Sequence, residues 1–238
     1  DKKERPPIPE APTIPDLIRN GTMSVEMAVT MWAFVSEQRS FVSVAEPRLA
    51  DKTAVAEAVM QMRQPGVPIN KLDGTMEQMD SFKQKAPGGY LMISEIRQGP
   101  FQDYIWGELT LRLFGTLDAG YSLMTTQHAS GLDDVFEQIC VGNQVDDAAA
   151  SRIGLVIYIR RFGDETNGFW RRVTEVHEVD RVEGGRAHGR LLHSWREADD
   201  TFEAVEPPAA LQQHNGSLAL AWPHSGDWLS LAKVPPQT

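Results

Sequence analysis

Hydrophobic positions along the chain alternate between a helical spacing and short apolar runs. Apolar residues recur at helical intervals from Ser24 to Gln38, with Ser24 as the expected N-cap, and again from Lys52 to Arg63. Between these two segments, residues 41–45 form an apolar run (Phe-Val-Ser-Val-Ala) that predicts a buried strand. Strand and helix signals that alternate in this way are typical of an α/β protein.

The alternation continues through the middle of the chain and then stops. In order, the pattern predicts a strand at 90–93, a helix from Phe101 to Leu117, a strand from Tyr121 to Thr126, and a helix up to Ile139 that begins at a capping pair of Ser130 and Asp133. From about residue 154 onward, three β-like segments follow one another with glycine-containing turns between them: Leu155–Ile159, Arg171–Val179 and Arg186–Trp195. Consecutive strands of this kind indicate an antiparallel addition.

We therefore expect an α/β fold, with a mainly parallel sheet that is flanked by helices and carries an appended antiparallel β region and extended ends. The parallel strands are expected near Phe41, Ile69, Tyr90, Tyr121 and Leu155, and the antiparallel ones at about 171–195. Residues 1–15 contain five prolines and are expected to form an extended linker. The expected organisation is a linker at 1–15, a folded domain at 16–205 and a tail at 206–238, whose Trp222 and Trp228 would pack on the domain.

Composition narrows the class of protein. The chain of 238 residues has 23 basic and 33 acidic residues, so its net charge is −10. This charge disfavours a protein that coats nucleic-acid phosphates, and we expect no direct nucleic-acid partner. Cys140 is the single cysteine, and no apolar run approaches the ~20 residues that span a bilayer. We therefore expect a cytoplasmic protein without a transmembrane helix.

Ligands of parallel α/β sheets bind at the carboxyl ends of the strands, which directs attention to residues 46–53, directly after the first strand. Lys52 and Thr53 match the end of the phosphate-loop pattern G-x-x-x-x-G-K-[ST]. Glu46 and Asp51, however, replace its two glycines. Glycine lets backbone N–H groups approach phosphate, whereas carboxylates repel it. The residues alone leave both a phosphate loop and an ordinary strand–loop–helix connection open.

Other motifs make the chain resemble a known family. Residues 91–97 (Leu-Met-Ile-Ser-Glu-Ile-Arg) resemble a strand that ends in Gly-Glu-Val-Arg, and residues 125–129 (Thr-Thr-Gln-His-Ala) resemble a Thr-x-His-Ala histidine box. Residues 71–77 are similar to an acidic Glu-Asp-Thr-x-Glu-Leu segment, and residues 172–179 look like a closing hairpin. Over about residues 14–205, the chain resembles the ATPases of type II and type IV secretion, type IV pili and archaeal flagella, which are RecA-like hexameric motors.

The resemblance implies a RecA-like fold and a nucleotide site with ATP and Mg²⁺ as cofactors. It implies that Glu95 is the general base, with His128 and Arg97 as further catalytic residues. It also implies cofactor binding by Lys52, Thr53, Pro47 and Asp73, with Mg²⁺ held by Thr53 and Glu95. The implied assembly is a homo- or hetero-hexamer that works with inner-membrane secretion or pilus platform proteins, in a peripheral position at the inner face of the membrane.

Each retained residue also has a simpler explanation. Lys52 could lie in a solvated first helical turn, Glu95 could form a plain salt bridge with Arg97, and His128 could be a hydrogen-bonded residue at a strand end. Two functions therefore remain open: a nucleotide-driven motor module, and a pseudo-ATPase that acts as a structural or regulatory subunit. Because of the acids at the glycine positions, we expect ATP hydrolysis by this chain to be slow or absent.

Two further expectations concern geometry. Lys52, Glu95 and His128 follow three different strands, and crossover connections should bring them to one edge of the sheet. The basic and aromatic residues between Arg160 and Arg172 could stack single-stranded nucleic acid, but a β-hairpin with one packed face explains them better.

Overall fold

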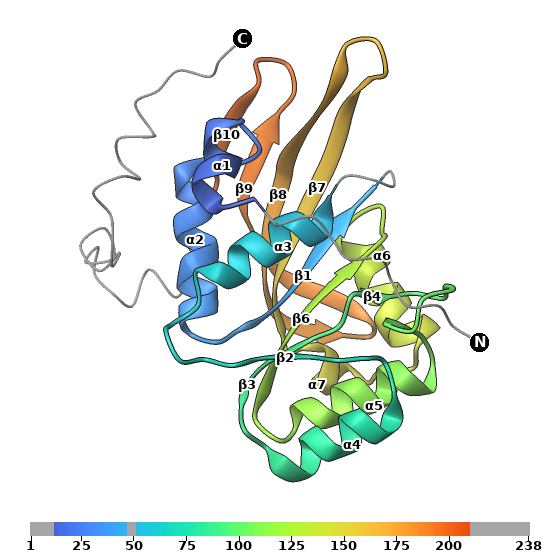
Figure 1. The fold of residues 1–238 in the computed structure, drawn as a ribbon. Helices are drawn as coiled ribbons and strands as arrows, with labels where there is room; N and C mark the ends of the chain where they lie inside the picture. Colours follow the sequence, from blue (N-terminus) through green and yellow to red (C-terminus); the bar gives the residue numbers. More distant parts are fainter. Residues whose placement is uncertain (1–11, 47–50, 210–238) are drawn as a thin grey trace.

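The computed structural model describes residues 12–46 and 51–209, and in this part of the chain a twisted eight-stranded sheet runs through the molecule (Figure 1). The strand order is β10-β9-β8-β7-β1-β6-β3-β2. Parallel pairing joins five of them: β1 (Ser40–Ala45), β2 (Ile69–Lys71), β3 (Gly89–Met92), β6 (Tyr121–Gln127) and β7 (Ile153–Asp164). The five expected parallel strands are confirmed.

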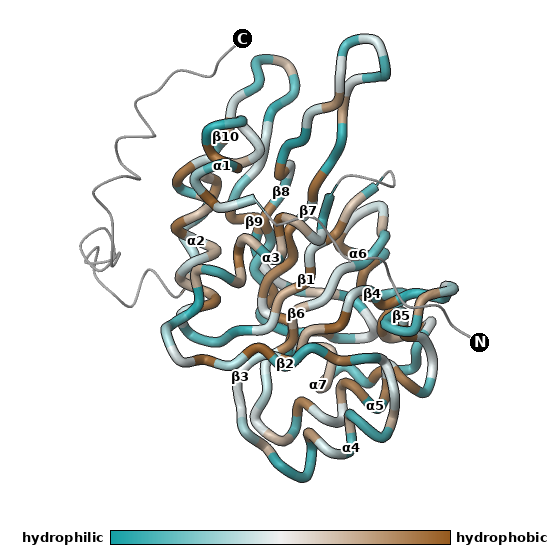
Figure 2. Tube along the Cα trace, viewed as in Figure 1, coloured by the Kyte–Doolittle hydropathy of each residue, from teal (hydrophilic) through white to brown (hydrophobic). Residues whose placement is uncertain are grey.

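Helices cover both faces of the sheet. One face carries α1 (Ile14–Arg19), α2 (Val25–Ser36) and α3 (Lys52–Gln61), and the other carries α4 (Met76–Lys85), α5 (Glu108–Leu117), α6 (Leu132–Phe136), the π-helix η1 (Glu137–Gly142) and α7 (Asp147–Ala150). Strand β1 shows why the sheet is double-faced: Phe41 packs into one core, and Val42 and Val44 pack into the other. Apolar stretches therefore gather where helices meet the sheet (Figure 2).

The antiparallel region is also confirmed. Strands β8 (Gly168–Glu183), β9 (Arg186–Arg196) and β10 (Thr201–Ala204) follow β7 in antiparallel pairs, and the β7–β8 hairpin projects beyond the body (Figure 1). On one face of this hairpin, the ring of Phe162 stacks on Trp170 at 4.4 Å and lies 4.9 Å from Trp195. This packing supports the interpretation of residues 160–172 as a hairpin with one packed face.

One predicted helix is shorter than expected. The helix expected from Phe101 to Leu117 begins only at Glu108, because Gly107 has φ 63° and ψ −123°, which no helix accommodates. Before it, β5 (Tyr104–Ile105) pairs with β4 (Glu95–Ile96) in a separate two-stranded sheet. Ile105 stands at a helical spacing from Leu109 and Leu113, but it lies in this strand rather than in the helix.

The start of another expected helix also differs, and a helix that was not expected overlaps the end of the linker. Ser130 does not pair with Asp133; its backbone N–H and its hydroxyl both donate to Asp134, at 2.8 and 3.0 Å, and α6 starts after Gly131. Helix α1 begins at Ile14, capped by Thr13, so the last two residues of the expected linker are helical. Ser24 is the expected N-cap of α2.

Several expectations for the ends lie outside the described residues, among them most of the linker and the tail with Trp222 and Trp228. None of the helices in the described residues is both long and apolar enough to cross a membrane.

Candidate functional site

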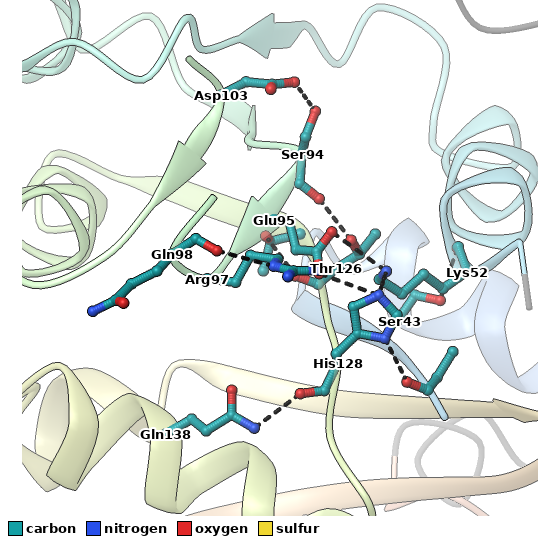
Figure 3. Close-up of polar contacts among 12 residues, drawn as sticks. Ser43, Lys52, Ser94, Glu95, Arg97, Gln98, Asp103, Thr126, His128 and Gln138 are labelled. Atoms are coloured by element: carbon teal, nitrogen blue, oxygen red, sulfur yellow. Dashed lines mark hydrogen bonds and ion pairs between the residues drawn. The ribbon is translucent and has the colours of Figure 1, made fainter. Parts of the chain in front are cut away.

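Three side chains that follow three neighbouring strands meet at the carboxyl edge of the sheet (Figure 3). Lys52 opens α3 after β1, Glu95 follows β3, and His128 follows β6. The Lys52 ammonium lies 3.0 Å from His128 Nε2 and 3.4 Å from Glu95 Oε2. The convergence expected from the order of strands is confirmed.

Lys52 is buried rather than solvated, with 8% of its surface exposed. Its backbone carbonyl accepts a hydrogen bond of 2.9 Å from the buried hydroxyl of Ser43 on β1, so the first turn of α3 is tied to the strand before it. Thr53 follows in the same turn and is half-buried. The simpler interpretation of Lys52, as a solvated residue of a first helical turn, is therefore wrong.

Glu95 is the most buried charge of the cluster, with 2% of its surface exposed. Its Oε1 lies 3.6 Å from Arg97 and 3.6 Å from His128 Nε2, and this atom has no hydrogen-bond partner among the described residues. The expected salt bridge to Arg97 exists, but Lys52 approaches the same carboxylate more closely. With His128 neutral, Lys52 and Arg97 outweigh Glu95 by one positive charge within the cluster, and the carboxylates of Glu46 and Asp134 in the adjoining cleft oppose this excess.

His128 is held in one tautomer by the backbone. Its Nδ1–H donates to the carbonyl oxygen of Ala45 at 3.0 Å, so Nε2 carries the lone pair that accepts a hydrogen bond from Lys52. Burial lowers the pKa of His128, and the Lys52 ammonium lowers it further, against the opposing effect of Glu95. The imidazole is therefore neutral near pH 7, and it links Lys52 to the end of β1.

A second set of polar residues holds the ends of two of these strands, β3 and β6, and local sequence patterns give no sign of it. Gln138 on η1 donates to the His128 carbonyl oxygen at 2.9 Å, and the Thr126 hydroxyl donates to the Ser94 carbonyl oxygen at 2.6 Å. The Ser94 hydroxyl donates to Asp103. These contacts hold the backbone beside His128 and Glu95, and they come from segments 9 to 32 residues away, which no local motif reports.

One of the expected cofactor-binding residues, Asp73, is not brought into this cluster. Asp73 lies beyond β2, where its carboxylate accepts hydrogen bonds from the Thr75 N–H at 2.9 Å and from the Thr75 hydroxyl at 2.7 Å. It therefore organises the start of α4. Pro47 lies outside the described residues.

An open cleft of about 650 Å³ adjoins the cluster. His128 and Arg97 form one part of its wall, and Trp106, Ser130 and Gln138 form others. A volume of this size accommodates a small organic ligand. Glu46, at the end of β1, lines the same cleft and places a negative charge at its edge.

No protein-family model and no curated protein sequence matches the chain. In structure, it is similar to the VirB11 ATPase from the Brucella suis type IV secretion system in complex with sulphate, with a TM-score of 0.48 and 15% identity over 74% of this chain and 60% of that one. It is also similar to the ATPase DotB from Legionella pneumophila (TM-score 0.47, 10% identity, 68% of this chain and 49% of that one) and from Yersinia pseudotuberculosis (TM-score 0.48, 11% identity, 90% and 55%).

The chain thus spans between 49% and 60% of the length of these solved chains. At TM-scores of 0.47–0.48 and identities of 10–15%, the likeness concerns only the course of the backbone, and it says nothing about what this chain binds.

The residues present at the strand ends fit a Mg²⁺–nucleotide in their chemistry. A hydroxyl (Thr53) and a carboxylate (Glu95) are oxygen donors, which Mg²⁺ prefers. The buried Glu95 Oε1 also retains capacity to accept a hydrogen bond. Lys52 supplies the positive charge that phosphate requires.

Proposed function

We propose that the chain is an ATPase-type module of the kind that powers secretion or the assembly of type IV filaments, and that Lys52, Glu95 and His128 form its phosphate site. The observation that carries this proposal is their meeting at the carboxyl ends of three adjacent parallel strands, β1, β6 and β3. A hexameric ring, inner-membrane platform partners and a cytoplasmic, peripheral location belong to the same proposal and follow from the motif resemblance.

Each side chain has a role that suits its surroundings. Lys52 would place its ammonium on the phosphate oxygens, and Thr53 and Glu95 would hold Mg²⁺, which neutralises phosphate charge when it is bound. Glu95 Oε1 would accept the proton of the attacking water, a task that suits a buried carboxylate with an open lone pair. When Lys52 turns to phosphate, His128 Nε2 would lose this donor and would accept a hydrogen bond from another donor at the phosphate site. Arg97 would remain beside Glu95 as its counter-charge.

The second candidate is a pseudo-ATPase that serves as a structural or regulatory subunit. It is favoured by Glu46 and Asp51 in the glycine positions of the phosphate loop. It is also favoured by the contacts of Lys52, whose ammonium is engaged by Glu95 and His128.

Isothermal titration with ATP and Mg²⁺ separates the two candidates. The motor proposal expects binding that Lys52→Ala abolishes, and slow phosphate release that Glu95→Gln abolishes while binding persists. Lys85→Ala, at an exposed lysine of α4, and Glu108→Gln, at an exposed glutamate of α5, are the matched controls and should change neither. Binding without turnover, or no binding that depends on Lys52, would support the pseudo-ATPase.

A further inference from the structure

Asp51, the acid that directly precedes Lys52, has an unusual backbone conformation. Its φ of 53° and ψ of 38° lie in the left-handed region, which glycine adopts freely and which asparagine and aspartate tolerate best among the other residues. Its side chain makes no capping hydrogen bond to α3 and instead forms an ion pair with Arg171 on β8. The acid thus keeps the conformation that a glycine would supply, and its charge is engaged by a distant strand.

Arg171 reaches Asp51 from the β7–β8 hairpin, where its backbone is paired with that of Arg161. Neighbouring arginines of this hairpin have other contacts: Arg161 stacks on Phe169 at 4.3 Å, and Arg172 bonds both carboxylate oxygens of Asp200 at 2.7 Å. Within the described residues, Arg171 is the hairpin arginine that is ion-paired with the start of α3.

We propose that Arg171 is a positioning residue that offsets the charge of Asp51 and so allows an acid to stand at the last glycine position of the phosphate loop. This inference rests on the proposed function. A carboxylate next to Lys52 would compete with phosphate for the ammonium and would repel phosphate directly. Paired with a guanidinium, the same carboxylate contributes little net charge beside the phosphate site.

A double-mutant cycle tests this role. The variants are Arg171→Gln and Asp51→Asn, alone and together, since asparagine removes the charge and still accepts a left-handed backbone. Binding of Mg²⁺–ATP and of Mg²⁺–tripolyphosphate is measured by isothermal titration, and thermal unfolding without ligand shows that each variant is folded. Arg161→Gln is the matched control, because it removes the same charge from the cross-strand neighbour.

The expected result is a loss that depends on charge. Arg171→Gln should weaken binding of both ligands at least about tenfold when Asp51 is present and less than about threefold in the Asp51→Asn background. Rescue by Asp51→Asn is a result that a merely structural role of Arg171 would not produce. Arg161→Gln should stay within about threefold of the wild type, and Asp51→Asn alone should bind at least as tightly as the wild type.

Other outcomes overturn the inference in distinguishable ways. Equal losses in the two backgrounds would mean that Arg171 contacts phosphate itself, and no loss in either would make it a bystander. If Arg171→Gln does not fold, weaker binding by Asp51→Asn alone contradicts the inference, and tighter binding supports it. If neither the wild type nor any variant shows binding that depends on Lys52, the proposed function fails and this inference fails with it.

Discussion

Replacing Lys52 by alanine should destabilise the ligand-free protein, because Lys52 contacts a carboxylate that is almost fully buried. At an effective dielectric constant of about 20, the contact of 3.4 Å between Lys52 and Glu95 corresponds to a gross attraction of about 5 kcal/mol. Removing one partner of a buried ion pair costs about 3–5 kcal/mol, because the other charge is left uncompensated. Arg97 stays near Glu95 at 3.6 Å, so we expect the low end, about 3 kcal/mol.

Urea denaturation and calorimetry measure this loss. In a domain of this size, about 3 kcal/mol lowers the unfolding midpoint by roughly 6–12 °C. Adding Glu95→Gln to Lys52→Ala should restore at least about 1 kcal/mol, because the stranded charge is removed. Lys85→Ala is the control and should stay within about 0.5 kcal/mol of the wild type. If Lys52→Ala is as stable as this control, or if the double variant is no more stable than the single one, the ion-pair reasoning is refuted.

Two more predictions concern stability away from the cluster. Burial lowers the pKa of His193 from 6.5 to about 4, so between these pH values only the unfolded chain takes up a proton at this residue, and the free energy of unfolding should fall by about 3 kcal/mol as the pH falls over this range. Urea titrations at several pH values measure the effect: His193→Gln should show a smaller fall, and the control His188→Gln, at an exposed histidine of the same strand, should behave like the wild type. The Asp147 carboxylate accepts hydrogen bonds from the N–H groups of Gly184 and Gly185, at 2.7 and 2.9 Å, in the β8–β9 turn, so Asp147→Ala should lower the free energy of unfolding by about 2 kcal/mol, as measured by thermal unfolding. The exposed Asp133→Ala is the control, and an equal loss of stability in it would show that the turn is not the cause.

The layout of the sheet could be predicted because its strands have simple signatures. Residues 41–45 and 90–93 are short apolar runs between helical spacings, and such runs in a parallel sheet are buried on both faces. The predicted helix from Phe101 is too long because Ile105 falls on the same spacing as Leu109 and Leu113. The informative residue is Gly107, whose positive φ separates strand from helix and whose N–H bonds to Asn143, a partner that local periodicity does not reveal.

The meeting of Lys52, Glu95 and His128 could also be predicted, since topology alone brings strand ends together. The contacts that these three side chains make could not be predicted. The Ala45 carbonyl sets the tautomer of His128, and the Ser43 hydroxyl bonds the Lys52 backbone carbonyl; these partners become neighbours only in the folded chain. Likewise, the sequence alone suggests that Asp51 only repels phosphate. Its ion pair with Arg171 joins residues that are 120 positions apart (171 − 51), and no local pattern reveals it.

The central place of β1 in the sheet has a consequence for synthesis of the chain. This strand pairs with β6 on one side and with β7 on the other, although both are made much later. A chain that is elongating from its N-terminus therefore carries this mainly apolar strand with two open backbone edges until residues 121–127 emerge, and with one open edge until residues 153–164 follow. Such edges are templates for pairing with other chains. Truncation before residue 153 should therefore yield an aggregating product rather than a smaller folded domain.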